Sequence, residues 1–175
     1  KIIATIEARL GSTRLPNKVL RKIGTKSILE IIIERISNSK FIDEIIIATT
    51  KNKIDDSIYN LAKKKKFTCF RGSEFNVLDR IARAIIKYKG DTIVQLTGDN
   101  PLVDYKLIDK MLKFFKKNKL DFLTNSGFGD DKIRTYPIGT DIKIFKGKDL
   151  IIINKLKLNK IYREHPSLYF YKNKK

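Results

Sequence analysis

Three cations, two hydroxyl groups and a glycine crowd a short loop near the start of the chain. The apolar run Ile2–Ile6 predicts a strand, and the loop after it reads Glu7-Ala8-Arg9-Leu10-Gly11-Ser12-Thr13-Arg14-Leu15-Pro16-Asn17-Lys18. Arginine and lysine neutralise phosphate charge, while glycine lets backbone amides approach an anion closely. The loop is neither a Walker A sequence nor a dinucleotide-binding GxGxxG. It therefore indicates a phosphate site of another kind, with a charged surface loop as the alternative.

Two aspartates at junctions between strands and loops are candidates for a metal site. Gly98-Asp99 directly follows the apolar run Thr92–Thr97, so we expect the Asp99 carboxylate at the end of a strand. Asp141 closes the segment Tyr136-Pro137-Ile138-Gly139-Thr140-Asp141, which leads into another strand. Mg²⁺ usually takes one or two protein carboxylates together with substrate phosphates. The two aspartates therefore predict a Mg²⁺ site, with a role in turn formation as the alternative for each.

Two further segments carry residue types that bind ligands. Arg71-Gly72-Ser73-Glu74 follows an apolar run, and Gly72 would let a base lie against the backbone, with a plain turn as the alternative. The single histidine sits in Arg163-Glu164-His165-Pro166. It is a candidate for contact with an anionic substrate, and a surface or capping role is the alternative.

The composition limits the class of protein. The chain has 175 residues, of which 42% are hydrophobic and 33% charged, as in one globular domain with a substantial core. No apolar run approaches the roughly 20 residues of a membrane-spanning helix, and no signal peptide is visible. A single cysteine excludes an internal disulfide and suits a reducing compartment. We therefore expect a single domain over residues 1–175, a cytoplasmic location and no membrane partner.

The formal net charge of +19 is the strongest signal in the composition. A basic chain can bind nucleic acid, an anionic membrane surface or a phosphorylated substrate. The lysines are spread along the chain, as in Lys63–Lys66 and Lys172–Lys175, and mostly lack interleaved aromatic residues. A solvated surface explains such runs. We therefore expect no nucleic-acid partner, and a basic nucleic-acid-binding protein stays an alternative.

Apolar runs and amphipathic patterns alternate along the first 125 residues. Strands are predicted at 2–6, 44–50, 67–70, 92–97, 121–124 and 140–145. A 3.6-residue period predicts helices at about 28–36, 56–63, 78–86, 105–115 and 148–158. Asp55 or Asp56 is expected to cap the second helix, and the aromatic tail from Tyr162 has no clear partner. The alternation predicts an α/β fold, with a mostly parallel sheet and helices on both faces.

The loops that carry the unusual residues are expected to lie together. Ligands of such sheets bind beyond the carboxyl ends of the parallel strands. The loops after Ile6, Thr50, Phe70, Thr97 and Thr124 should therefore share one edge of the sheet, which we call the rim.

Five segments together resemble a known family. Ile6–Leu20, Arg71–Arg80, Thr97–Asp104, Tyr136–Phe145 and Arg163–His165 resemble the spore-coat-polysaccharide SpsF-type branch of the cytidylyltransferases. The wider group includes the enzymes that make CMP-3-deoxy-manno-octulosonate and CMP-sialic acids. The resemblance covers nearly the whole chain. Its most specific parts are Ala-Arg-x-Gly-Ser-Thr-Arg-Leu-Pro-x-Lys and Thr-Gly-Asp-x-Pro-Leu-Val-Asp.

The resemblance implies a nucleotide-diphospho-sugar-transferase fold and transfer of CMP from CTP to an acidic sugar, with release of pyrophosphate, for surface polysaccharide biosynthesis. It assigns nucleotide binding to Ala8, Arg9, Gly11, Ser12, Thr13, Arg14, Lys18, Arg71, Gly72, Thr97 and Gly98. It assigns catalytic roles to Arg9, Arg14, Lys18 and Asp99. Mg²⁺ would bind Asp99 and Asp141. The sugar side would be formed by Tyr136, Gly139, Arg163, Glu164 and His165.

Two features depart from the family pattern. Many members have an acidic residue two positions after the second aspartate, where this chain has Lys143, which leaves one or two metals open. Relatives are usually longer, so we expect elements to be missing after Arg163–His165. A glycosyltransferase that uses a sugar nucleotide, and a truncated relative that binds CTP without turnover, stay open as alternatives. The family often forms dimers, so a homodimer is a further expectation.

Overall fold

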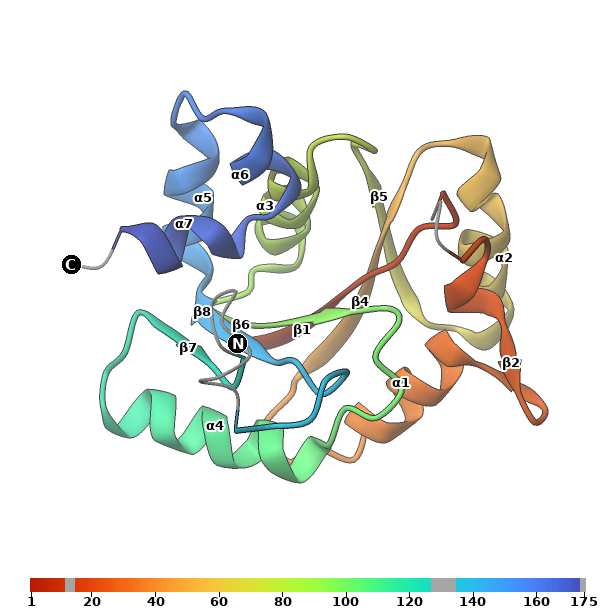
Figure 1. Ribbon diagram of the computed structural model, residues 1–175, viewed down its shortest axis with the longest axis horizontal. Coiled ribbons are helices and arrows are strands. Elements are labelled where there is room, and N and C mark those ends of the chain that lie inside the picture. Colours follow the sequence, from red (N-terminus) through yellow and green to blue (C-terminus); the bar gives the residue numbers. More distant parts are fainter. Residues whose placement is uncertain (12–14, 127–134, 174–175) are drawn as a thin grey trace.

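The β-branched runs of the sequence form the strands of one sheet. The computed structural model describes residues 1–11, 15–126 and 135–173, and six of its strands pair in the order β5-β4-β1-β6-β8-β7 (Figure 1). The strands are β1 (Ile2–Glu7), β4 (Glu44–Thr50), β5 (Thr68–Gly72), β6 (Thr92–Thr97), β7 (Phe122–Thr124) and β8 (Lys143–Lys146). Isoleucine, valine and threonine suit these positions because branched side chains pack well on a pleated surface.

Four neighbouring strands of the sheet are parallel. β1 pairs with β4 on one side and β6 on the other, and β4 pairs with β5. β8 is antiparallel and lies between β6 and β7. β7 therefore points in the same direction as β6 without pairing with it. The pattern of the first 125 residues does not reveal this insertion, because β8 comes from later in the chain. The mostly parallel sheet of the prediction is confirmed.

Helices cover both faces of the sheet, as predicted (Figure 1). One face carries α1 (Ile28–Ile36), α2 (Asp56–Lys65) and α4 (Tyr105–Lys117). The other carries α3 (Val77–Tyr88) and α5 (Gly147–Lys155), followed by α6 (Lys160–Glu164) and α7 (Ser167–Lys172). The remaining short elements are the 3-10 helices η1 (Lys18–Leu20) and η2 (Lys53–Asp55) and the two-stranded ribbon β2 (Lys22–Ile23) and β3 (Lys26–Ser27). None of the helices in the described ranges is long and apolar enough to cross a membrane.

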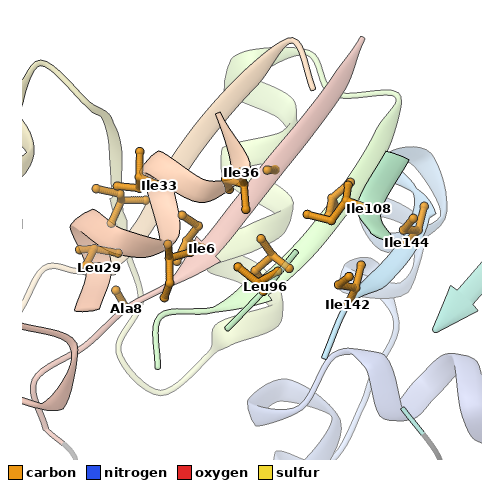
Figure 2. Packing of buried hydrophobic residues seen from close by; sticks show 14 of the residues in the cluster. Ile6, Ala8, Leu29, Ile33, Ile36, Leu96, Ile108, Ile142 and Ile144 are labelled. Atoms are coloured by element: carbon orange, nitrogen blue, oxygen red, sulfur yellow. The ribbon is translucent and has the colours of Figure 1, made fainter. Parts of the chain in front are cut away.

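Apolar stripes on the helices build the two layers of the core. Figure 2 shows Leu29 and Ile36 of α1, Ile6 of β1, Leu96 of β6 and Ile108 of α4 in one cluster. Leu29 and Ile36 are seven residues apart, about two helical turns, so both lie on the side of α1 that faces the sheet. Burying one such side chain stabilises the fold by about 1.5–3 kcal/mol. A second cluster lies under α3 and α5 on the opposite face.

The helix predicted at 148–158 is wrong at its end. α5 stops at Lys155, and a short break separates it from α6. The Arg163 guanidinium donates hydrogen bonds to the carbonyl oxygens of Asn154 (3.0 Å) and Leu156 (2.7 Å). A side chain from α6 therefore satisfies carbonyls at the end of α5, and the helix does not need to continue.

The aromatic tail does have a partner, contrary to the prediction. In α7, Phe170 stacks on Phe122 of β7 with ring centroids 5.0 Å apart, and on Phe145 of β8 at 5.3 Å. Tyr171 meets Phe122 edge to face. The contact joins residues far apart in the chain, so periodicity within the tail could not predict it.

Glu30 fastens the start of α1. Its carboxylate accepts hydrogen bonds from the Ser27 backbone N–H (2.9 Å) and hydroxyl (2.7 Å), and the Lys65 ammonium lies 2.9 Å away. Burial opposes ionisation of Glu30, but the two bonds from Ser27 and the charge of Lys65 outweigh it. The pKa of Glu30 falls from 4.5 to about 2.

Glu30→Gln is expected to lower the free energy of unfolding by about 1–2 kcal/mol at neutral pH. Because the pKa is lowered in the folded state, the charge stabilises the fold above pH 4.5, and this contribution is lost as the pH falls from 4.5 toward 2. Urea unfolding of both proteins across this range measures the difference. Glu34→Gln is the control, since Glu34 is on the same helix but 51% exposed. If the difference in the free energy of unfolding between wild type and Glu30→Gln did not change with pH, the assignment would be contradicted.

Candidate active site

The loops at the carboxyl ends of the parallel strands are neighbours, as the sequence predicts. The Gly98 N–H, just after β6, donates to the carbonyl oxygen of Glu7 at the end of β1 (2.8 Å). The Lys51 N–H, just after β4, donates to that of Gly72 at the end of β5 (3.0 Å). These bonds join the strand ends in pairs, so side chains from distant parts of the sequence meet at the rim.

Lys18 and Asp99 form the central contact of the rim. The Lys18 ammonium of η1 donates to the Asp99 carboxylate and pairs with its charge. Burial opposes ionisation of Asp99, but hydrogen bonds from Lys18 and Thr97 outweigh it and hold the pKa of Asp99 below its ordinary value. Asp99 is therefore an ionised carboxylate that already holds one cation. An ionised carboxylate of this kind can serve as a metal ligand, and here the Lys18 ammonium supplies the positive charge that a metal ion would supply.

Gly98 allows this contact. A Cβ atom at Gly98 would lie 2.9 Å from the Glu7 carbonyl oxygen, 3.1 Å from the Ala8 Cβ and 3.3 Å from a methyl group of Val19. Val19 follows Lys18 in η1, so the missing side chain lets η1 approach the end of β6. Gly98 thus has a packing role beside the nucleotide-binding role predicted for it.

Asp141 enters the rim from β8. Gln95 of β6 lies opposite Lys143 of β8 in the antiparallel pair. Two residues further along, Thr97 and Asp141 leave the two strands at the same end of the sheet. Asp141 therefore lies at the edge where Asp99 follows β6, as the Mg²⁺ prediction requires.

Asn125, which the sequence analysis missed, fastens the chain on both sides of Asp141. Its amide group donates to the Thr140 carbonyl oxygen (2.8 Å) and accepts from the Ile142 N–H (2.7 Å). Asn125 follows β7 directly, at a strand end like Asp99, and this position was the only signal in the sequence.

Two carboxylates at the rim are available as ligands for a metal ion. Within residues 1–11, 15–126 and 135–173, no group of three or more histidine, cysteine, aspartate or glutamate side chains could hold a metal by itself. Asp99 and Asp141 are two carboxylates at one edge, which suffices when phosphate oxygens and water complete the shell. Lys143 pairs with Gln95 and Thr124 inside the sheet and supplies no further carboxylate.

The first loop is held from below by Asp55. The Asp55 carboxylate is 1% exposed and accepts hydrogen bonds from the Leu10 N–H (2.7 Å) and the Thr50 hydroxyl. Its expected capping bond to α2 is absent, because the carboxylate is engaged with the loop. The candidates Arg9 and Gly11 are exposed. Three other candidates, Ser12, Thr13 and Arg14, lie outside the described residues.

Arg71 and Gly72 belong to the end of β5 rather than to the loop after it. The Arg71 guanidinium donates to the carbonyl oxygens of Thr50 (2.8 Å) and Asn52 (3.0 Å) and pairs with Asp56 (2.7 Å). Arg71 therefore joins β5 to the loop after β4. Its predicted contact with the nucleotide stays a prediction.

The five residues predicted for the sugar lie on two separate segments. Tyr136 lines a groove of about 390 Å³ beside α4, and Gly139 occupies the following turn with a positive φ of 88°. Arg163 binds the end of α5 on the other face, and Glu164 pairs with Lys160 at 3.6 Å. The remaining residue of the five, His165, is exposed directly after α6.

Residues 3–175 match the cytidylyltransferase family. The chain belongs to this family. It is 37% identical over 175 residues to the spore coat polysaccharide biosynthesis protein SpsF of Bacillus subtilis, covering 96% of this chain and 69% of that protein. It is similar to a solved cytidylyltransferase of Leptospira borgpetersenii, with a TM-score of 0.90 and 38% identity over 99% of this chain and 71% of that one.

A more distant structure shares the fold. The chain superposes with a TM-score of 0.73 and 16% identity on a CMP:2-keto-3-deoxy-manno-octonic acid synthetase complexed with CTP, covering 98% of this chain and 86% of the other. The resemblance drawn from the five sequence segments is therefore confirmed for the cytidylyltransferase family and for its nucleotidyltransferase fold.

Gly98→Ala is expected to lower the free energy of unfolding by about 1–3 kcal/mol, because the new methyl group meets a backbone oxygen that cannot move alone. Urea unfolding measures the change. Gly11→Ala is the control, since a Cβ at Gly11 meets no atom within 4 Å. Equal stability of the two variants would contradict the close approach of β1 and β6.

Proposed function

We propose that this cytidylyltransferase-family chain transfers CMP from CTP to a hydroxyl group of an acidic sugar and releases pyrophosphate. The observation that carries the proposal is the Lys18–Asp99 pair, which puts a cation and an ionised carboxylate together at the rim. The name of the similar SpsF protein supports a role in polysaccharide biosynthesis. The product would then be a CMP-sugar used to build a surface polysaccharide.

The reaction is an in-line displacement at the α-phosphorus of CTP. A sugar oxygen forms a bond to this phosphorus, the bond to the bridging oxygen breaks, and pyrophosphate leaves with the electron pair. The hydroxyl proton passes to solvent. The protein contributes mainly by positioning the reactants and neutralising their charge.

The cations of the first loop would bind the triphosphate. Arg9 is exposed beside the rim and Lys18 is fixed at its centre, so both can stabilise the charge that grows on the leaving pyrophosphate. Arg14 completes this set in the proposal. On binding, the Lys18 ammonium would exchange Asp99 for a phosphate oxygen.

Asp99 and Asp141 would hold Mg²⁺. When bound, Mg²⁺ neutralises phosphate charge and aligns the α-phosphate. Asn125 keeps the segment around Asp141 in place, and Gly98 keeps Asp99 close to η1.

The cytidine and the sugar would occupy different sides of the phosphates. Arg71, Gly72, Thr97 and Gly98 would line the cytidine pocket. For the sugar we propose the segment from Tyr136 to Gly139 together with Glu164 and His165. Arg163 would act on the sugar side by holding α6, because its guanidinium is engaged with α5.

The test measures pyrophosphate release in the presence of Mg²⁺ and a panel of 2-keto-3-deoxy acidic sugars. Release is expected when the nucleotide is CTP and not when it is ATP, GTP or UTP. Asp99→Asn is expected to reduce turnover by about 100-fold or more, because the phosphates lose a charged metal ligand. Asp91→Asn is the matched control, since Asp91 precedes the same strand at its other end and is 81% exposed.

Retention of most turnover by Asp99→Asn would overturn the metal assignment. Consumption of a sugar nucleotide without CTP would favour the glycosyltransferase alternative. Binding of CTP without release by any sugar would favour a binding protein without turnover.

Metal binding is expected to follow nucleotide binding, because the Lys18 ammonium already occupies Asp99. Mn²⁺, followed by its electron paramagnetic resonance signal, should bind weakly to the protein alone and more tightly with CTP. Lys18→Gln should bind Mn²⁺ without CTP on the order of tenfold more tightly than wild type, since a like charge is removed. Lys22→Gln is the control, as Lys22 is an exposed residue of β2. Equal Mn²⁺ affinity of wild type and Lys18→Gln would contradict this competition.

A further inference from the structure

α3 carries a buried arginine that the proposed chemistry does not use. Arg80 is 1% exposed and is one of the largest fully buried side chains. Its Nη1 donates to the Ser73 carbonyl oxygen (2.5 Å), while its Nε has no hydrogen-bond partner among the described residues. A buried donor left unpaired costs about 1–3 kcal/mol. Packing alone therefore does not account for an arginine at this position.

Charges of the rim surround Arg80. Burial disfavours the guanidinium charge and, with the like charge of Arg9, lowers the pKa of Arg80, whereas the carboxylates of Glu7, Asp55 and Glu74 favour the charge. Glu7 ends β1, and Asp55 holds the first loop. Arg80 thus lies beneath the rim, within electrostatic reach of the loop proposed to bind the triphosphate.

The stem of Arg80 occupies the space where a side chain at position 72 would lie. A Cβ atom at Gly72 would be 2.8 Å from the Cγ and 3.1 Å from the Cβ of Arg80, and 3.1 Å from the Phe70 ring. The end of β5 and the second turn of α3 are therefore in close contact. Glycine at 72 and arginine at 80 fit each other.

The short segment between them is held from inside. The Asn76 N–H donates to the Ser73 hydroxyl oxygen (3.1 Å), and the Arg80 N–H donates to the Asn76 carbonyl oxygen (3.1 Å). With the guanidinium bond to the Ser73 carbonyl, Arg80 contacts both ends of the turn from Ser73 to Asn76. The backbone of this turn therefore has little freedom to reorient.

We propose that Arg80 is a positioning residue for nucleotide specificity, because it fixes the turn at Ser73–Asn76 against which the base lies. The inference rests on the proposed function, in which Gly72 and its neighbours line the cytidine pocket. Cytosine carries an amino group where uracil carries a carbonyl oxygen. A backbone acceptor that cannot turn away favours the amino group and rejects the carbonyl. Without Arg80 the turn can reorient, and the affinities of the site for cytosine and uracil nucleotides become more similar.

The test is the ratio of the dissociation constants for CTP and UTP, measured by calorimetry with Mg²⁺ and without a sugar. Arg80→Met is expected to lower the preference for CTP by about tenfold or more, through weaker CTP binding. Arg80→Lys keeps a donor and a charge and should restore part of the preference. Arg83→Met is the matched control, since Arg83 lies on the same helix, is 67% exposed and pairs only with Asp79 among the ion pairs of the described residues.

The ratio separates positioning from general stability. Loss of stability alone would weaken the binding of CTP and UTP equally and leave the ratio of their dissociation constants unchanged. If Arg80→Met does not fold, Arg80→Lys decides, because it loses the fixed geometry of the guanidinium and should lower the ratio in the same direction to a smaller extent.

The outcomes distinguish the two proposals. A wild type without preference for CTP would overturn the proposed function. A wild type that prefers CTP, with a folded Arg80→Met or Arg80→Lys variant at the same ratio, would overturn the role of Arg80 and leave the proposed function in place.

Discussion

The rim depends on how closely β1 and β6 approach at their carboxyl ends. The Gly98 N–H lies 2.8 Å from the Glu7 carbonyl oxygen, and a side chain at 98 would meet that same oxygen at 2.9 Å. Because the strands meet so closely, the loop after β1 passes directly beside the loop after β6. Lys18 can then reach Asp99, and a cation and a carboxylate that are 81 positions apart in the chain come into contact.

Polar side chains that lie at least partly inside the fold hold the loops of the rim in place. Asp55 binds the first loop, Asn125 binds the chain around Asp141, and Arg80 binds the turn after β5. Asp55 and Arg80 are each 1% exposed, so water cannot compete for their bonds, and the loss of these bonds is costly, whereas Asn125 is partly buried. The loops are thus ordered by the scaffold beneath them, as a site that relies on positioning requires.

The sequence predicts the reactive groups better than it predicts their supports. Lys18 and Asp99 follow strands in a basic loop and a Gly-Asp turn, so their residue types and places are enough to select them. Asp55 looks like a helix cap, and Asn125 and Arg80 look like ordinary surface residues. The partners of Asp55 and Asn125, such as Leu10 for Asp55 and Ile142 for Asn125, lie in other loops, whereas Arg80 binds the turn directly before its own helix. Such pairings depend on which strands become neighbours, and no local pattern contains that information.

The sequence by itself determined the family, the strands of the main sheet and the five longer helices, because hydrophobic periodicity and short motifs are local properties of the chain. It missed β2, β3, α6 and α7, and it placed the start of β8 and the end of α5 about three residues away from where they lie. Only the tertiary structure decided that β8 inserts between β6 and β7, which brings Asp141 to the rim. It also decided that Phe170 of the tail covers Phe122 and Phe145. Both results have the same physical reason. Strand order and side-chain contacts depend on how apolar surface is buried over the whole chain, and a local sequence pattern contains no information about distant segments.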